Sequence, residues 1–163
     1  MKMLLLLRHA KSSWDEPGLE DHDRPLNKRG RKAAPRIGQL LRDEEIAPDV
    51  VLTSSALRAR DTAGAVCEVL GFEGGIDERH DLYLAGPGAY LRAIRELPDE
   101  AERVLVVGHN PGLEDLLEAL CGRCKRMPTA ALAAVELPVK HWRELELDGR
   151  ARCQHVWRVK DLD

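Results

Sequence analysis

Short apolar runs alternate with longer amphipathic segments along this chain. Residues 4–7 are four leucines that stop at Arg8, and an apolar run bounded by charge is typical of a strand buried on both faces. Similar runs predict strands over 50–53 and 103–108. Apolar residues at helical spacing predict helices over about 28–43, from a cap at Ser54 or Ser55 to 70, from 86–88 to 97, and from a cap at Asn110 to about 120.

Strands and helices alternate over most of the chain, which is the pattern of a mainly parallel sheet covered on both faces. Two further strands, over 130–137 and 153–160, are joined through a turn signal at Asp148-Gly149, and we expect them to be antiparallel and at an edge. The sequence therefore predicts an α/β fold of three α/β/α layers. Its length of 163 residues favours one domain over 1–163.

Composition narrows the classes of partner. The net charge is -3 and the basic residues are spread along the chain, so we expect no nucleic-acid surface. The apolar run that begins at Met3 is too short for a signal peptide, and no later segment has the length of a membrane span. We therefore expect a cytoplasmic protein that does not enter a membrane.

The four cysteines are Cys67, Cys121, Cys124 and Cys153. Without a signal peptide we expect them to be reduced thiols. Cys121 and Cys124 have metal-ligand or redox spacing, and Cys153 with His155 could complete a zinc site. The alternative, which we favour, is that Cys67 and Cys121 are small core residues on helices.

Basic side chains follow the ends of the predicted strands. Arg8 and His9 come directly after the first strand, Arg58 falls in the first turn of the helix after the second, and His109 follows the strand over 103–108. Ligands of open α/β sheets bind beyond the carboxyl ends of the strands. We therefore expect these four side chains to meet at one rim of the sheet.

Two arginines and two histidines together predict phosphoryl chemistry. The guanidinium fork matches a phosphate, and a neutral imidazole is a nucleophile. In this arrangement His9 attacks phosphorus, while Arg8, Arg58 and His109 bind the equatorial oxygens. Positioning and electrostatics supply the catalysis, so we expect neither a metal nor a cofactor. The long polar loop over 12–27 follows His9 and is expected to form one wall of the site.

Four motifs, at 7–11, 23–30, 53–63 and 106–111, are similar to those of the histidine phosphatase superfamily, whose fold is the phosphoglycerate mutase-like fold. The short chain and the Arg-His-Ala start most resemble its SixA-type phosphohistidine phosphatases. The resemblance implies that His9 accepts the phosphoryl group and places Arg24 near the site. It also implies a general acid after the superfamily's third strand. In this sequence that strand would lie in the uncertain segment over 76–84, where Asp81 is the best match and Glu78 the second.

This resemblance favours a phosphohistidine phosphatase. Its substrate would be a protein that carries phosphohistidine, such as a phosphotransfer domain. The leaving imidazole can be protonated near neutral pH, so a weakly placed acid is tolerable for this substrate. One alternative is a phosphatase of small phosphate esters in the same pocket. Another is a non-catalytic phosphate-binding module.

Overall fold

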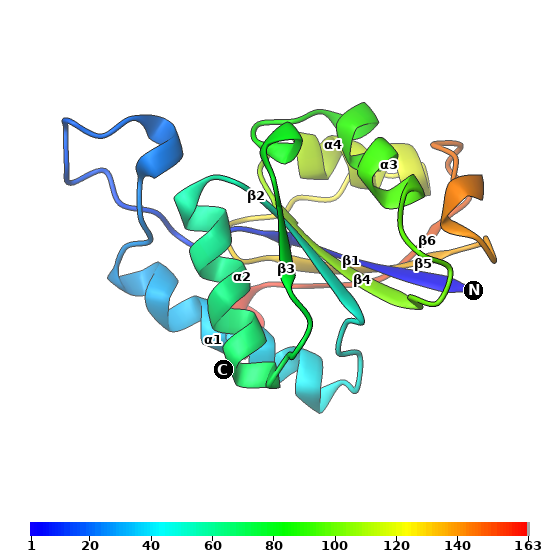
Figure 1. Cartoon of the computed structure of the whole chain (residues 1–163), viewed down its shortest axis with the longest axis horizontal. Coiled ribbons are helices and arrows are strands. Elements are labelled where there is room, and N and C mark those ends of the chain that lie inside the picture. Colours follow the sequence, from blue (N-terminus) through cyan, green and yellow to red (C-terminus); the bar gives the residue numbers. More distant parts are fainter. Residues whose placement is uncertain (163) are drawn as a thin grey trace.

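A computed structural model describes residues 1–162 (Figure 1). Its strands form one sheet in the order β3-β2-β4-β1-β5-β6. The strands described within these residues are β1 (Lys2–Arg8), β2 (Val50–Ser54), β3 (Ile76–Arg79), β4 (Arg103–Gly108), β5 (Leu132–Leu137) and β6 (Arg152–Trp157).

The sheet is parallel on one side and antiparallel on the other. β1 pairs in parallel with β4, and β2 pairs in parallel with both β4 and β3. β5 runs antiparallel to β1, and β6 runs antiparallel to β5. The prediction of a mainly parallel α/β sheet with antiparallel strands at one edge is confirmed.

Helices cover both faces of the sheet, as Figure 1 shows. Alternate leucines of β1 pack on the two faces. Leu5 and Leu7 lie in the core under α1 (Lys28–Asp43) and α2 (Leu57–Leu70), while Leu4 and Leu6 lie in the core under α3 (Pro87–Arg95) and α4 (Gly112–Cys121). This two-sided burial is why the run over 4–7 has no polar position. Short 3-10 turns are also described: η1 (Asp21–Asp23), η2 (His80–Leu82), η3 (Trp142–Glu144) and η4 (Val159–Leu162).

Two of the predicted helix caps are wrong. The residue before α2 is Ala56, because the Ser54 hydroxyl, which accepts from the Ala56 N–H, is directed to a histidine described below. The residue before α4 is Pro111, because the Asn110 amide instead donates to the Met127 carbonyl at 2.8 Å. Both side chains are therefore committed to contacts beyond the helix they precede.

The last strand is shorter than predicted. β6 ends at Trp157, and the chain then turns into η4, where Val159 and Leu162 pack against the core under α1. Apolar residues at 156 and 159 fit a continuing strand, but the second of them packs on a helix. This turn brings the basic residues Arg158 and Lys160 beside the start of α1.

The described residues also bear on two questions raised by the sequence, a membrane span and a zinc site. None of their helices combines the length and apolar character that crossing a bilayer requires. All four cysteines are free, and no three His, Cys, Asp or Glu side chains within residues 1–162 are grouped as metal ligands would be. The structure therefore does not support the zinc alternative.

Candidate active site

The ends of β1, β2 and β4 lie side by side, and their next residues form the site. Arg8 is in register with Gly108, and Thr53 is in register with Val107. His9 and His109 consequently leave neighbouring strands at the same rim. Their ring centroids are 5.2 Å apart, so the two imidazoles share one pocket.

His9 is held in one tautomer. Its Nδ1 lies 2.8 Å from the carbonyl oxygen of Ala10. A carbonyl only accepts, so Nδ1 carries the proton and Nε2 keeps its lone pair. Burial, with a smaller contribution from the positive charges of Arg58 and Arg8, lowers the pKa of His9 to about 4. At neutral pH the ring is therefore an uncharged nucleophile.

Ser54 holds His109 in the same Nδ1–H tautomer as His9. The Ser54 hydroxyl oxygen accepts the Ala56 N–H at 3.2 Å and lies 2.7 Å from His109 Nε2. The acceptor available for the hydroxyl proton is that ring nitrogen, so Nδ1 of His109 carries the ring proton. Burial, followed by the nearby His9 and Arg58, lowers the pKa of His109 to about 3. The neutral ring thus offers Nδ1–H as a donor.

Arg58 is a charged side chain that is only 3% exposed. It enters from the first turn of α2, and its guanidinium donates to the carbonyl oxygen of Asp21 at 2.8 Å and to its carboxylate at 3.0 Å. These two hydrogen bonds, both to Asp21, fix the plane of the Arg58 guanidinium at the rim of the pocket.

Asp21 holds more than Arg58. Its carboxylate also accepts from Arg24, with the closest guanidinium nitrogen at 3.1 Å, and from the hydroxyl of Tyr83. Partial burial by itself raises the pKa of this carboxyl, but the bonds from Tyr83 and Arg58 outweigh it and lower the pKa to about 2. A permanent anion here orients both arginines.

The loop over 12–27 forms one wall of the pocket, as predicted. Arg24 donates to the Ser12 hydroxyl at 2.9 Å, and its guanidinium carbon lies 3.4 Å from the centre of the Trp14 ring. Ser12, Trp14 and Arg24 all line the same cavity as the two histidines. In Figure 1 this loop projects from the end of β1.

The cavity measures about 240 Å³ and holds polar atoms that lack partners. Within residues 1–162, four buried side-chain atoms have no hydrogen bond: Nε of Arg8, Nε of Arg58, Nδ1 of His109 and Oδ1 of Asn110. All four residues line this one cavity. Unpaired buried polar groups are costly, and three of these are N–H donors. The arrangement therefore matches an anion with several acceptor oxygens.

Comparison with known proteins agrees with this geometry. Residues 4–82 match the histidine phosphatase superfamily (branch 1). An uncharacterized protein of Mycobacterium tuberculosis is 34% identical over 151 residues, which cover 86% of this chain and 92% of that protein. A structure described as the putative phosphohistidine phosphatase SixA from Agrobacterium tumefaciens is 32% identical with a TM-score of 0.82, covering 96% of this chain and 97% of that one. A second, from Nakamurella multipartitia, is 30% identical with a TM-score of 0.81, covering 96% and 95%.

The chain belongs to the histidine phosphatase superfamily. Within it the chain is of the SixA type, as the structural matches indicate. Its α/β sheet is the phosphoglycerate mutase-like fold of that superfamily. It is accordingly a phosphatase.

Asp81 is not brought into the pocket of this histidine phosphatase. It is exposed, and both of its carboxylate oxygens accept from Arg79, at 3.1 and 3.0 Å. The Arg79 hydrogen bond lowers the pKa of Asp81, which opposes proton donation near neutral pH. Glu78 is likewise exposed and lies 3.8 Å from Arg60. Neither residue is among those that line the cavity.

Three residues of the site were not singled out in the sequence as site residues: Asp21, Ser54 and Tyr83. Asp21 belongs to the acidic stretch over 15–23, and its spacing of three residues from Arg24 was the available signal. Ser54 was assigned only a capping role. Tyr83 reaches Asp21 and packs edge-on to His109, with ring centroids 5.6 Å apart, through a tertiary contact that has no local signature.

Proposed function

We propose that this protein is a metal-independent phosphohistidine phosphatase that hydrolyses phosphohistidine on a polypeptide. The single observation that carries the proposal is the set of unpaired donors on Arg8, Arg58 and His109 around the free Nε2 of His9. Donors aimed at one anion beside a neutral nucleophile suit phosphoryl transfer.

The reaction has two steps. His9 Nε2 attacks phosphorus, a bond from Nε2 to phosphorus forms, and the bond to the leaving imidazole of the substrate breaks. Arg8, Arg58 and Nδ1–H of His109 bind the phosphoryl oxygens, and Arg24 borders the same cavity. Water then attacks the phosphohistidine on His9 and releases phosphate, which returns the lone pair to Nε2.

The substrate class is argued from proton supply. The acids expected after β3 are exposed and paired with arginines. An alkoxide leaving group needs a proton donor, whereas an imidazole leaving group can be protonated near neutral pH. Of the residues that the structure describes, none that lines the cavity is a carboxylic acid. This site therefore favours phosphoramidates over phosphate esters.

A polypeptide substrate is supported by apolar side chains at the rim. Trp14 is 76% exposed and Leu84 is 58% exposed, and both line the cavity. Leu84 also holds a left-handed backbone, with φ of 51°, which is uncommon for a bulky residue. Exposed aromatic and aliphatic side chains around a polar cavity are typical of a surface that contacts another protein.

The test compares two substrates on the purified protein. A histidine peptide phosphorylated with phosphoramidate should be hydrolysed with a kcat/KM at least tenfold higher than an aryl phosphate, and activity should persist in EDTA. The variant His9→Ala should be inactive on both. A higher kcat/KM for the aryl phosphate would favour the small-ester alternative, and loss of activity in EDTA would contradict metal independence.

A further inference from the structure

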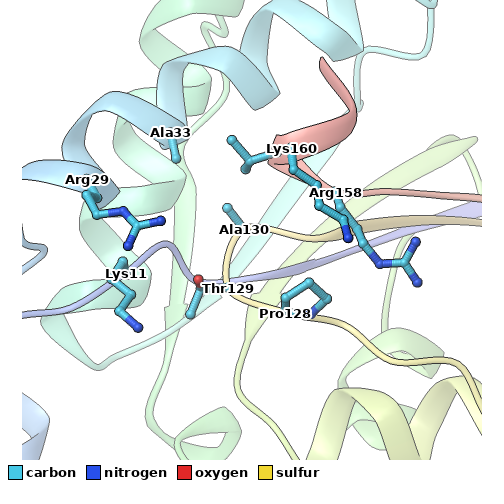
Figure 2. Close-up of a pocket in the computed structure, with 9 residues that line it drawn as sticks. Lys11, Arg29, Ala33, Pro128, Thr129, Ala130, Arg158 and Lys160 are labelled. Carbon is cyan, nitrogen blue, oxygen red and sulfur yellow. The ribbon is translucent and has the colours of Figure 1, made fainter. Parts of the chain in front are cut away.

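A second cavity lies beside the active site. Figure 2 shows it between the segment after β1, the start of α1, the loop before β5 and the chain after β6. It measures about 220 Å³. Lys11 and Thr129 line both this cavity and the active-site cavity, so the two are adjacent.

Four cations from three segments of the chain line this cavity: Lys11, Arg29, Arg158 and Lys160. We call it the basic pocket. In Figure 2, Lys11 and Arg29 lie on one side and Arg158 and Lys160 on the other, with Thr129, Ala130 and Pro128 between them. Among residues 1–162, no acidic side chain lines it.

Within residues 1–162 these four cations have no ion-pair partner, in contrast to Arg24 and Arg58 of the active site. Arg24 and Arg58 both bind Asp21, whereas within the described residues no side-chain hydrogen bond or ion pair involves the four cations of the basic pocket. The chain as a whole is acidic, with 28 Asp and Glu against 25 Lys and Arg. A cavity bordered by four unneutralised cations is therefore a local exception, and it attracts anions.

The floor of the basic pocket indicates what kind of anion fits. Ala33, Pro128, Ala130 and Val159 supply apolar surface beneath the cations. A glutamate side chain, with methylene groups below a carboxylate, matches both the floor and the rim. A free phosphate would leave the apolar part unused.

We propose that the basic pocket binds carboxylates of an acidic segment on the polypeptide that carries the phosphohistidine. This inference rests on the proposed function, since it assigns a second contact to the same substrate. The phosphoryl group enters the active-site cavity while acidic side chains nearby in the substrate reach past Lys11 to the neighbouring cations. Such contacts speed association and select partners by charge.

The experiment uses two peptides with a central histidine phosphorylated by phosphoramidate. One carries glutamates on both sides of the histidine, and the other carries glutamines at the same positions. We expect wild type to hydrolyse the acidic peptide with a higher kcat/KM, and the advantage to shrink as salt rises. In the double variant Arg29→Glu/Lys160→Glu, kcat/KM should fall about tenfold on the acidic peptide and less than twofold on the neutral one.

A matched control carries the same change in charge elsewhere. Lys140 and Arg143 follow β5, whose last residue, Leu137, pairs with Lys2 at the opposite end of the sheet from the site. The variant Lys140→Glu/Arg143→Glu should keep the preference for the acidic peptide. An equal loss in both double variants would mean that only overall charge matters, and would overturn the proposal.

A binding measurement separates this inference from the proposed function. The unphosphorylated acidic peptide, labelled with a fluorophore, should bind wild type more tightly than Arg29→Glu/Lys160→Glu, whether or not any peptide is hydrolysed. Equal binding would overturn the inference and leave the phosphatase proposal standing. Binding of phosphatidylserine vesicles through the same residues, with no preference between the peptides, would assign the basic pocket to a membrane surface instead and would also overturn it.

Discussion

Ser54 offers a sharp test of how the site is organised, because among the residues that line the cavity its hydroxyl contacts only His109. Its hydroxyl accepts the Ala56 N–H and holds the proton of His109 on Nδ1 by donating to Nε2 at 2.7 Å. In the variant Ser54→Ala, Nε2 loses that donor. The ring can then move its proton to Nε2 and present a lone pair to the phosphoryl oxygens.

The size of the effect follows from the hydrogen bond. The net contribution of one hydrogen bond is about 1 kcal/mol, and a buried acceptor left without a donor costs about 1–3 kcal/mol. We therefore expect a loss of about 1–2 kcal/mol in transition-state binding, which is about 5- to 30-fold in kcat/KM. The upper limit is His109→Ala, which removes the donor outright and should cost about 100- to 1000-fold.

The matched control is Thr53→Val. Thr53 is the preceding residue of β2, is equally buried, and donates to the Ser54 carbonyl at 3.1 Å rather than to the site. It should keep kcat/KM within about twofold, as a hydroxyl outside the site should. The assay is kcat/KM on the phosphorylated histidine peptide, read beside ¹⁵N NMR of the His109 ring.

The position of the proton on the His109 ring, read by NMR, distinguishes a change of tautomer from loosened packing. Wild type should show His109 protonated at Nδ1, and Ser54→Ala should show proton density moving to Nε2. Unchanged activity and an unchanged tautomer in Ser54→Ala would refute the reasoning. So would an equal loss of activity in Thr53→Val.

Two further results concern stability. Burial lowers the pKa of His9 to about 4 and of His109 to about 3, below the ordinary 6.5 of the unfolded chain. The unfolded state therefore binds more protons below pH 6.5, and the protein loses stability as the pH decreases. At about 1.36 kcal/mol per pKa unit, lowering the pH from 6.5 to 5 should reduce the free energy of unfolding by about 2 kcal/mol per ring. In the variant His9→Gln/His109→Gln, urea unfolding should show a reduction that is smaller by that amount for each ring removed. An equal reduction in wild type and variant would contradict the account. Gly30→Ala places a Cβ 2.1 Å from the Lys11 carbonyl oxygen and should cost about 1–3 kcal/mol, whereas Gly64→Ala, with nothing within 4 Å in α2, should stabilise by up to about 1 kcal/mol. Thermal unfolding of both variants measures this, and equal shifts would contradict it.

Much of the fold could be predicted because the sheet has strong local signals. Runs of apolar residues over 4–7 and 104–107 are buried on both faces, and such runs have few other solutions. The meeting of His9 and His109 also followed from a general rule, since parallel neighbouring strands end at one rim. Arg58 was placed correctly because its helix starts directly beyond β2.

The remaining features depend on contacts that leave no trace in local sequence. Asp21 meets Arg58 and Tyr83 across separations of 37 and 62 residues, and one acid in an acidic loop looks like any other. Asp81 has a plausible position along the chain, yet Arg79 two residues away captures it. Lys160 was predicted to end the last strand, but the chain leaves the sheet after β6 and packs on α1.

The central claim is that His9 accepts the phosphoryl group on Nε2, and trapping the phosphorylated enzyme tests it most directly. Wild-type protein is mixed with the phosphorylated histidine peptide, quenched in base within milliseconds, and mapped by mass spectrometry. The account predicts a phosphoryl group on His9 that is stable to base, labile to acid and absent in His9→Ala. Rapid hydrolysis of the peptide with label on another residue, or label undiminished in His9→Ala, would contradict it.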